Sequence, residues 1–279
     1  MSSAPENLPE LTSQCVVLAR LAGEKILSVY ETGDFDVVSK ADSTPLTKAD
    51  LAAHHPIVSA LQCLEFQAPI LSEESATIDF SERNNWITYW LVDPLDGTRE
   101  FIRRNGEFSV NIALIHNGEP VIGVVYAPVL KLAYYAARGE GSWKQVDNQT
   151  ATRIHVREVP EDSVIVARSR SPQTGPMMKR FLDNVGRHEE LPMGSALKSC
   201  LVAEGAADVY PRLGPTSEWD TGAAQCVVEE AGGQISDLNR NSLRYNTRDS
   251  LINPHFLVFG SQRRDWVAYL PDGLSLYPA

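Results

Sequence analysis

The chain has 279 residues, 43% of them hydrophobic and 22% charged, which is typical of one large globular domain or two fused ones. The formal net charge of −11 argues against a nucleic acid polymer as a partner, because a phosphate backbone attracts clustered cations. No apolar run is long enough to span a bilayer, so we expect no integral membrane segment.

The beginning of the chain predicts two helices after a polar start. The opening residues lack the basic and apolar segments of a signal peptide, which predicts a cytoplasmic protein and leaves peripheral association with the inner membrane open. Apolar residues at three- and four-residue spacing predict a helix over residues 8–30, ended by Gly33. A second helix is predicted over residues 47–66, with Thr47 as its N-cap and Asp50 three positions later.

Strand patterns fill the middle of the chain, and strands alternate with helices in its second half. Asn117 and Gly118 predict a hairpin turn between two of the strands. A short apolar piece over 69–71 precedes the strands. Strands are predicted at 90–92, 109–115, 121–126, 131–137, 163–167, 207–210 and 256–260, and helices at 174–184, 195–204 and 220–231. The alternation predicts a layered α/β fold, with an α+β half over residues 1–157 tightly fused to an α/β half over residues 158–279.

Cysteines and histidines offer no recognisable site. The cysteines are too far apart for a CxxC motif, and we expect all four to be reduced packing residues. They are Cys15, Cys63, Cys200 and Cys226. The histidines show no metal-ligand spacing, and we assign none of them to catalysis. They are His54, His55, His116, His155, His188 and His255.

The densest group of reactive side chains follows a predicted strand, in the sequence WLVDPLDGT. Asp93 and Asp96 would face opposite ways in a continuing strand, but Pro94 and Gly97 end it, so both carboxylates can converge. Converging carboxylates repel each other unless a cation lies between them, and such hard oxygen ligands favour Mg²⁺ or Ca²⁺. The Leu95 carbonyl, in the same turn, offers a further ligand.

Two other interpretations of this pattern stay open. The first is a turn that carries two solvated aspartates and binds nothing. The second is the site of the haloacid dehalogenase class, in which two aspartates are separated by a single residue and the first is the nucleophile. The spacing between Asp93 and Asp96 is one residue longer, which counts against that class.

Two segments offer groups that can hold a phosphate. The backbone amides of Gly97 and Thr98 follow the aspartate turn and are suited to the scissile phosphate. Farther along, Ser195 is expected to cap a helix that carries Lys198 in its first turn, which indicates a second anion site. An ordinary capped helix with a solvated lysine explains the same two residues. Arg212 is a further candidate cation with less support.

Three motifs in order resemble the signature set of the inositol monophosphatase superfamily. They are LSEE with Glu73 and Glu74, DPLDGT with Asp93 and Asp96, and WDTGAA with Asp220, within roughly residues 40 to 235. The runs EFIRRNGEF, GVVYAP and SCLVAEG, the last followed by YPR, are similar to the 3'(2'),5'-bisphosphate nucleotidases of the CysQ type. The resemblance implies a layered α-β-α-β-α fold with mixed and antiparallel sheets.

The resemblance also implies roles for individual residues. It implies two or three Mg²⁺ ions held by Glu73, Asp93, the Leu95 carbonyl, Asp96 and Asp220. Asp50 and Thr98 are implied to activate the attacking water. The substrate is implied to contact Glu73, Gly97, Thr98, Ser195, Lys198 and Asp220.

Structural explanations exist for three of these residues. Glu73 fits a solvated loop carboxylate, Asp220 fits a helix N-cap, and Asp50 fits a capping box. By the roles that the resemblance implies, the first half of the chain is the metal-binding half and the second half contributes to substrate binding.

The implied activity is Mg²⁺-dependent hydrolysis of the 3'-phosphate of adenosine 3',5'-bisphosphate, a small phosphorylated substrate. Action on the sulfated analogue, a place in sulfur assimilation and inhibition by Li⁺ are implied too. One departure bears on nucleotide recognition, since the loop after residue 168 reads Ser-Arg-Ser-Pro, with Pro172 where such proteins have histidine. The alternatives are a phosphatase of the same fold that acts on inositol or fructose phosphates, and a non-catalytic phosphate-binding regulatory protein.

Overall fold

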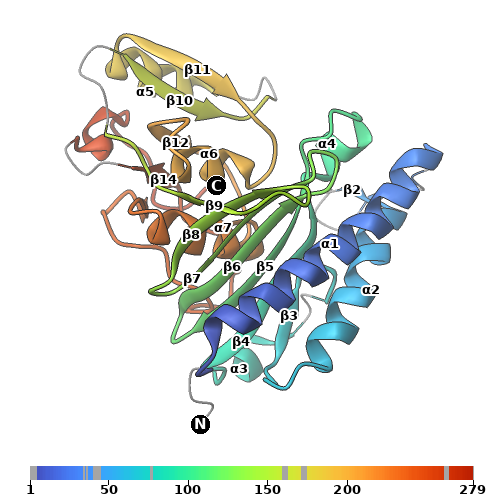
Figure 1. Ribbon diagram of the computed structural model, residues 1–279. Helices are drawn as coiled ribbons and strands as arrows, with labels where there is room; N and C mark the ends of the chain where they lie inside the picture. Colours follow the sequence, from blue (N-terminus) through green and yellow to red (C-terminus); the bar gives the residue numbers. More distant parts are fainter. Residues whose placement is uncertain are drawn as a thin grey trace.

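The computed structural model describes residues 5–33, 35, 37–39, 45–75, 78–158, 163–170, 175–260 and 264–278. Within these residues the strands form a seven-stranded sheet, a five-stranded sheet and a two-stranded ribbon. Helices lie outside the large sheet, between the two sheets, and outside the small sheet (Figure 1). The predicted layered α/β fold is therefore confirmed.

The large sheet carries one half of the candidate site at the end of its second strand. Its first two strands run parallel, and each later strand is antiparallel to its neighbour. In sheet order the strands are β3 (Ile70–Ser72), β4 (Thr88–Asp96), β5 (Ser109–His116), β6 (Glu119–Ala127), β7 (Leu132–Ala137), β8 (Gly141–Val146) and β9 (Thr152–Ile154). Asn117 and Gly118, with φ of 53° and 73°, form the predicted hairpin turn between β5 and β6.

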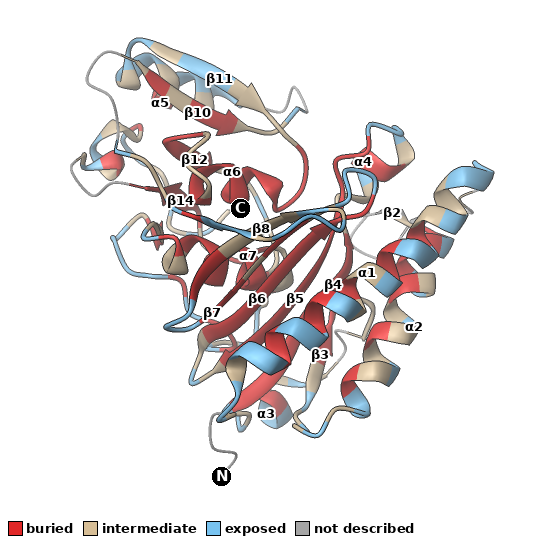
Figure 2. Ribbon diagram, in the orientation of Figure 1, coloured by how far each residue is buried: buried red, intermediate tan, exposed pale blue. Residues whose placement is uncertain are grey.

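Two long helices, α1 (Leu8–Thr32) and α2 (Lys48–Gln62), cover the outer face of the large sheet. Their apolar residues recur every three or four positions, so one stripe of each helix faces the sheet. Figure 2 shows this stripe as the buried faces of both helices, with exposed faces turned outward. The α1 residues Cys15, Ala19 and Ile26 are fully buried there.

Two helices fill the space between the sheets: α6 (Leu197–Ala203) and α7 (Glu218–Glu230). Both belong to the second half of the chain, yet α7 packs on β4, β5 and β6 of the first half. Nearly all its middle residues are buried, since one side meets each sheet. The N-terminal end of α7 thereby faces the C-terminal end of β4.

The small sheet lies beyond α6 and α7 and is mixed. In sheet order its strands are β11 (His188–Pro192), β10 (Val164–Arg168), β12 (Val209–Arg212), β14 (Phe256–Phe259) and β13 (Gln234–Asp237). Helix α5 (Pro176–Val185) and the 3₁₀ helix η2 (Trp266–Tyr269) cover its outer face through buried Phe181 and Trp266. The short elements are β1 (Val38–Ser39), β2 (Pro45–Leu46), η1 (Glu73–Ser75), α3 (Phe80–Arg83) and α4 (Thr98–Ile102).

The sequence predictions located most elements but missed the short or polar ones. The strands β1, β2, β8, β9, β11 and β13 were not predicted, and β3 was read only as a short apolar piece, because each is short or lacks an apolar run of its own. The helix predicted over 47–66 ends at Gln62, and the helix predicted from residue 195 begins at Leu197. The prediction that Ser195 caps this helix is wrong, because Ser195 has φ of 47° and Ala196 is the N-cap.

All four cysteines are free, as expected. Cys15, Cys200 and Cys226 are buried, but Cys63 is exposed, so its expected packing role is wrong. No helix among the described residues is long and apolar enough to cross a bilayer.

Candidate active site

The end of β4 turns two aspartates toward one point. On β4 Asp93 pairs with Asn111 of β5, and Asp96 pairs with Ser109, so three steps on β4 match two on β5. This extra residue is a bulge, which re-aims side chains that a regular strand would send to opposite faces. The Leu95 N–H donates to Asp93 Oδ1 at 3.0 Å and stabilises the turn. Gly97 follows with φ of 90°, a conformation that favours glycine.

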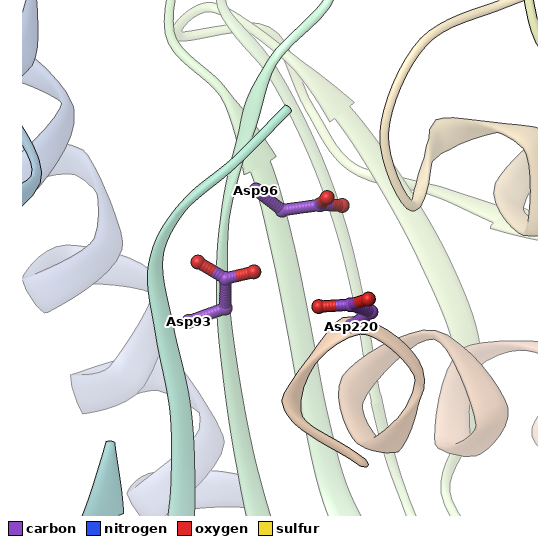
Figure 3. Close-up of side chains that lie close together, drawn as sticks. All are labelled: Asp93, Asp96 and Asp220. Atoms are coloured by element: carbon purple, nitrogen blue, oxygen red, sulfur yellow. The ribbon is translucent and has the colours of Figure 1, made fainter. Parts of the chain in front are cut away.

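A third carboxylate reaches the same point from α7. Asp220 is the third residue of the helix, and its Oδ2 accepts the Ser217 N–H at 3.0 Å. Ser217 is therefore the N-cap, and the expectation that Asp220 fits that position is wrong. Asp93, Asp96 and Asp220 each offer a carboxylate oxygen, and these three oxygens lie within 4.8 Å of one another (Figure 3).

Glu73 joins the group from the strand beside β4. Strand β3 runs parallel to β4 with Ser72 opposite Val92, so the residue after Ser72 emerges at the same sheet edge as Asp93. Glu73 begins the 3₁₀ helix η1 and lines the same cavity as the aspartates. Glu73 and Asp93, twenty residues apart in the sequence, therefore meet because β3 and β4 are parallel neighbours that end at the same edge of the sheet.

Burial raises the pKa of all three aspartates, and neighbouring carboxylates add to the shift of Asp93 and Asp220. Burial first, and then the charges of Glu73 and Asp96, raise the pKa of Asp93 well above its ordinary value. Burial, Asp96 and Glu73 raise the pKa of Asp220 to about 8. Burial also raises the pKa of Asp96, although the Lys198 charge opposes that shift. Hard oxygen donors that are buried close together fit a divalent cation such as Mg²⁺, because a bound cation reverses the raised pKa values.

Asp50 lies behind this group, at the beginning of α2. Its Oδ2 accepts the Thr47 N–H at 2.7 Å and the Thr47 hydroxyl at 2.6 Å, which confirms the capping box. Its Oδ1 lies 3.5 Å from Thr98 Oγ1, which also lies 3.4 Å from the Leu95 carbonyl oxygen. The side chain is 1% exposed, so the cap fixes a buried carboxylate against Thr98.

The second half of the chain supplies the opposite wall of the cavity. The Ala196 N–H donates to Asp96 Oδ2 at 2.6 Å and connects this wall to the aspartate turn. Lys198 is 6% exposed, its Nζ donates to the Ser195 carbonyl at 2.5 Å, and it lies 5.3 Å from the Tyr210 ring centre. Arg212 lines the same cavity. Carboxylates on one side and cations on the other suit a ligand that carries phosphate.

The cavity has a volume of about 770 Å³ and brings together nearly all the predicted site residues. Those that line it are Glu73, Asp93, Leu95, Asp96, Gly97, Thr98, Ser195, Lys198 and Asp220. Asp50 is the one predicted residue that contacts the site through another side chain, Thr98. Pro172, which the sequence placed near the nucleotide, lies outside the described residues.

Sequence reasoning missed two polar connections around the cavity. Ser109 Oγ lies 2.8 Å from Ser195 Oγ and donates to Asn111 Oδ1 at 2.8 Å, and the Asn111 amide donates to Asp96 Oδ2 at 3.3 Å. Glu107 binds Arg170 through two hydrogen bonds of 2.6 Å each. A signal existed for Glu107, because it is a charged residue between glycine and a strongly apolar run.

Comparison with known proteins agrees with this geometry. The model of the inositol monophosphatase family matches residues 7–265. The chain is 47% identical over 249 residues to the 3'(2'),5'-bisphosphate nucleotidase CysQ of Escherichia coli K12, covering 89% of this chain and 99% of that protein. It is 39% identical to the CysQ of Aggregatibacter actinomycetemcomitans, covering 92% of this chain and 95% of that one.

Solved structures of related proteins also match the chain. The crystal structure of CysQ from Bacteroides thetaiotaomicron matches with a TM-score of 0.80 at 40% identity, covering 92% of this chain and all of that one. The extragenic suppressor protein SuhB of Bartonella henselae matches with a TM-score of 0.76 at 26% identity, covering 95% of this chain and 99% of that one. The chain belongs to the inositol monophosphatase family.

Proposed function

We propose that the chain is a Mg²⁺-dependent 3'(2'),5'-bisphosphate nucleotidase that hydrolyses the 3'-phosphate of adenosine 3',5'-bisphosphate to AMP and phosphate. The observation that carries the proposal is the convergence of Asp93, Asp96 and Asp220 within 4.8 Å at a cavity with a cationic far wall. The names and identities of the CysQ relatives support the choice of substrate. Action on the sulfated analogue and a place in sulfur assimilation belong to the same proposal.

Glu73, Asp93, Asp96, Asp220 and the Leu95 carbonyl would hold two or three Mg²⁺ ions. Bound Mg²⁺ would neutralise charge on the phosphate and lower the pKa of a bound water, which makes that water a better nucleophile at neutral pH. The carboxylates must lose their protons to bind it, which the raised pKa values make dependent on pH.

Asp50 and Thr98 are proposed to orient the attacking water. The Asp50 carboxylate, fixed by its capping box, can accept a hydrogen bond from the Thr98 hydroxyl, which leaves the threonine oxygen free to accept a hydrogen bond from water. The backbone amides of Gly97 and Thr98 are proposed to hold the scissile phosphate. Loss of the Asp50–Thr98 pair is expected to lower kcat more than it changes KM, because the pair acts on the attacking water rather than on substrate binding.

The far wall is proposed to recognise the rest of the substrate. Lys198 provides a positive charge for the second phosphate, with Ser195 beside it. We also propose the division into a metal-binding half, residues 1–157, and a substrate-contributing half, residues 158–279, although Asp220 crosses it. A cytoplasmic location is part of the proposal, and cell fractionation tests it.

The test is phosphate release by the wild-type protein with Mg²⁺ from adenosine 3',5'-bisphosphate, inositol 1-phosphate and fructose 1,6-bisphosphate. We expect the bisphosphonucleotide to have the highest kcat/KM, with AMP as product and Li⁺ as an inhibitor. Preference for inositol or fructose phosphate would keep the metal chemistry and overturn the substrate. If the protein binds these phosphorylated compounds but releases phosphate from none of the three, a non-catalytic phosphate-binding protein is supported instead.

A further inference from the structure

Glu107 connects the two halves of the chain beside the cavity. It lies between α4 and β5 and is 8% exposed. Arg170, which follows β10 in the second half, donates from Nε and Nη2 to the two Glu107 oxygens at 2.6 Å each. A bidentate pair of this kind fixes direction as well as distance. The contact therefore fixes Arg170, two residues after the end of β10, against the first half.

The same carboxylate holds a second segment. The Gly194 N–H donates to Glu107 Oε2 at 2.9 Å. A Cβ at Gly194 would lie 2.3 Å from the Glu107 carbonyl oxygen, so the two backbones touch and no side chain fits between them. Ser195 follows directly, in a left-handed conformation with φ of 47°, and leads to Lys198.

These two segments form much of the far wall. Ser169, next to Arg170, lines the cavity, as do Ser195 and Lys198 after Gly194. Glu107 and Arg170 themselves are not among the described residues that line it. The pair therefore contacts both segments without itself lining the cavity.

We propose that the Glu107–Arg170 pair is a positioning clamp that sets the substrate-recognising wall and so selects the bisphosphonucleotide over small phosphate monoesters. The inference rests on the proposed function, which it deepens. A small monoester needs only the carboxylate side of the cavity, whereas the bisphosphonucleotide also needs the wall. Holding the wall in its binding geometry lowers the cost of ordering it when substrate binds.

The test compares Arg170→Ala, Glu107→Gln and the double variant with wild type, on adenosine 3',5'-bisphosphate and on p-nitrophenyl phosphate. The matched control is Arg240→Ala, which removes an exposed bidentate pair with Asp265 in the same half of the chain. We expect KM for the bisphosphonucleotide to rise roughly 10-fold in both single variants. The kcat is expected to stay within about twofold, as are all constants for p-nitrophenyl phosphate.

The double variant separates a clamp from direct substrate contact. A clamp predicts that the double variant is no worse than the more affected single one, because both single variants disrupt the Glu107–Arg170 pair. A defect in Arg170→Ala with none in Glu107→Gln would mean that Arg170 binds substrate itself and would overturn the clamp. Equal losses on both substrates, losses matched by Arg240→Ala, or no loss would overturn it too.

Failure of the proposed function is distinguishable from failure of the clamp. Wild-type protein that does not prefer the bisphosphonucleotide overturns the proposed function, whatever the variants do. The clamp is then tested on the substrate that the protein does prefer. The measured quantity is the ratio of kcat/KM for that substrate to kcat/KM for p-nitrophenyl phosphate. A ratio unchanged in both variants overturns the clamp, and a ratio lowered about 10-fold supports it.

Discussion

The two ends of α7 carry acidic groups in opposite situations. At its N-terminal end Asp220 faces Asp93 and Asp96, and burial and like charges raise its pKa to about 8. At its C-terminal end Glu230 accepts the N–H groups of Gly139 at 3.0 Å and Gly141 at 2.9 Å.

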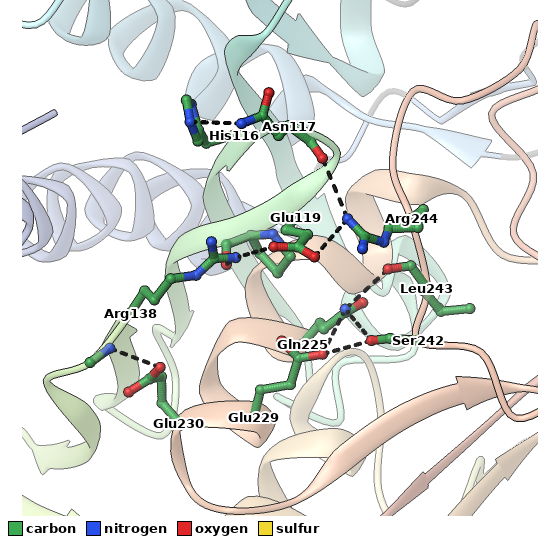
Figure 4. Close-up of polar contacts among 12 residues, drawn as sticks. His116, Asn117, Glu119, Arg138, Gln225, Glu229, Glu230, Ser242, Leu243 and Arg244 are labelled. Atoms are coloured by element: carbon green, nitrogen blue, oxygen red, sulfur yellow. Dashed lines mark hydrogen bonds and ion pairs between the residues drawn. The ribbon is translucent and has the colours of Figure 1, made fainter. Parts of the chain in front are cut away.

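Other carboxylates around the C-terminal end of α7 also have hydrogen-bond or ion-pair partners within the protein (Figure 4). Glu229 Oε1 accepts from Ser242 Oγ at 2.9 Å and from the Gln225 amide at 2.9 Å. Nearby, Glu119 pairs with Arg138 at 2.9 Å and with Arg244 at 2.6 Å.

One helix therefore shows where binding function and where stability reside. At the C-terminal end the protein supplies the partners, and Glu230 holds the turn between β7 and β8 to the helix. At the N-terminal end the carboxylates oppose one another, and the partner that fits them is a cation from outside the chain. Perturbed pKa values in a cleft favour a functional site for this physical reason. The predictions below test the contrast from the largest expected effect to the smallest.

Asp93→Asn is expected to separate activity from stability at the N-terminal end. The amide keeps the oxygen that accepts the Leu95 N–H but loses the charge proposed to bind metal. We expect kcat/KM to fall by roughly two to three orders of magnitude. The metal-free variant should melt no lower than wild type, because one of several repelling charges is gone. Steady-state kinetics and thermal melting with EDTA measure the two effects, and a fall in both together would contradict the contrast.

The stabilisation by Mg²⁺ is expected to grow with pH. Asp220 ordinarily titrates near 3.8 but near 8 in the fold, so between these values the folded chain binds more protons than the unfolded one. Metal-free stability therefore falls as pH rises toward 8, while Mg²⁺ binding, which displaces those protons, becomes stronger.

Melting curves at pH 5.5 and pH 8.5, with and without Mg²⁺, measure the difference. Mg²⁺ at 100 times its Kd adds about 2.7 kcal/mol, which is roughly 5–10 °C for a chain of this size. We expect a gain of that order at pH 8.5 and a clearly smaller one at pH 5.5. An equal gain at both values, or the reverse order, would be inconsistent with carboxylates as the ligands.

Glu230→Gln is expected to cost stability and leave activity intact. The amide retains one acceptor but sets its NH₂ group against a backbone N–H, so one of the two hydrogen bonds to Gly139 and Gly141 is lost. We expect a loss of about 1–2 kcal/mol in urea unfolding at unchanged m-value. Arg244→Ala is the matched control, because its exposed pair with Glu119 is expected to contribute under about 1 kcal/mol. A drop in kcat/KM for Glu230→Gln would show that the two ends of α7 are coupled.

The sequence predicted much of the fold because periodicity follows burial. Helix α1 was predicted almost to its end, since an apolar stripe on a long helix repeats often enough to be read. Strands β11 and β13 were missed, because each is short and its place depends on the strands that flank it. The start of α7 was placed two residues late, since Ser217 and Asp220 both suit a cap and only the hydrogen bonds distinguish them.

The candidate site divides in the same way. The sequence by itself determined which residues are candidates for the chemistry, because DPLDGT, the Glu73 pair and the Asp220 motif are local patterns that can be read without the fold. Only the tertiary structure decided that Asp220 from α7 meets Asp93 from β4, and that Glu107 holds Arg170 and Gly194. The physical reason is that residue type fixes what a group can bind, whereas its charge state and partners depend on which distant segments bury it.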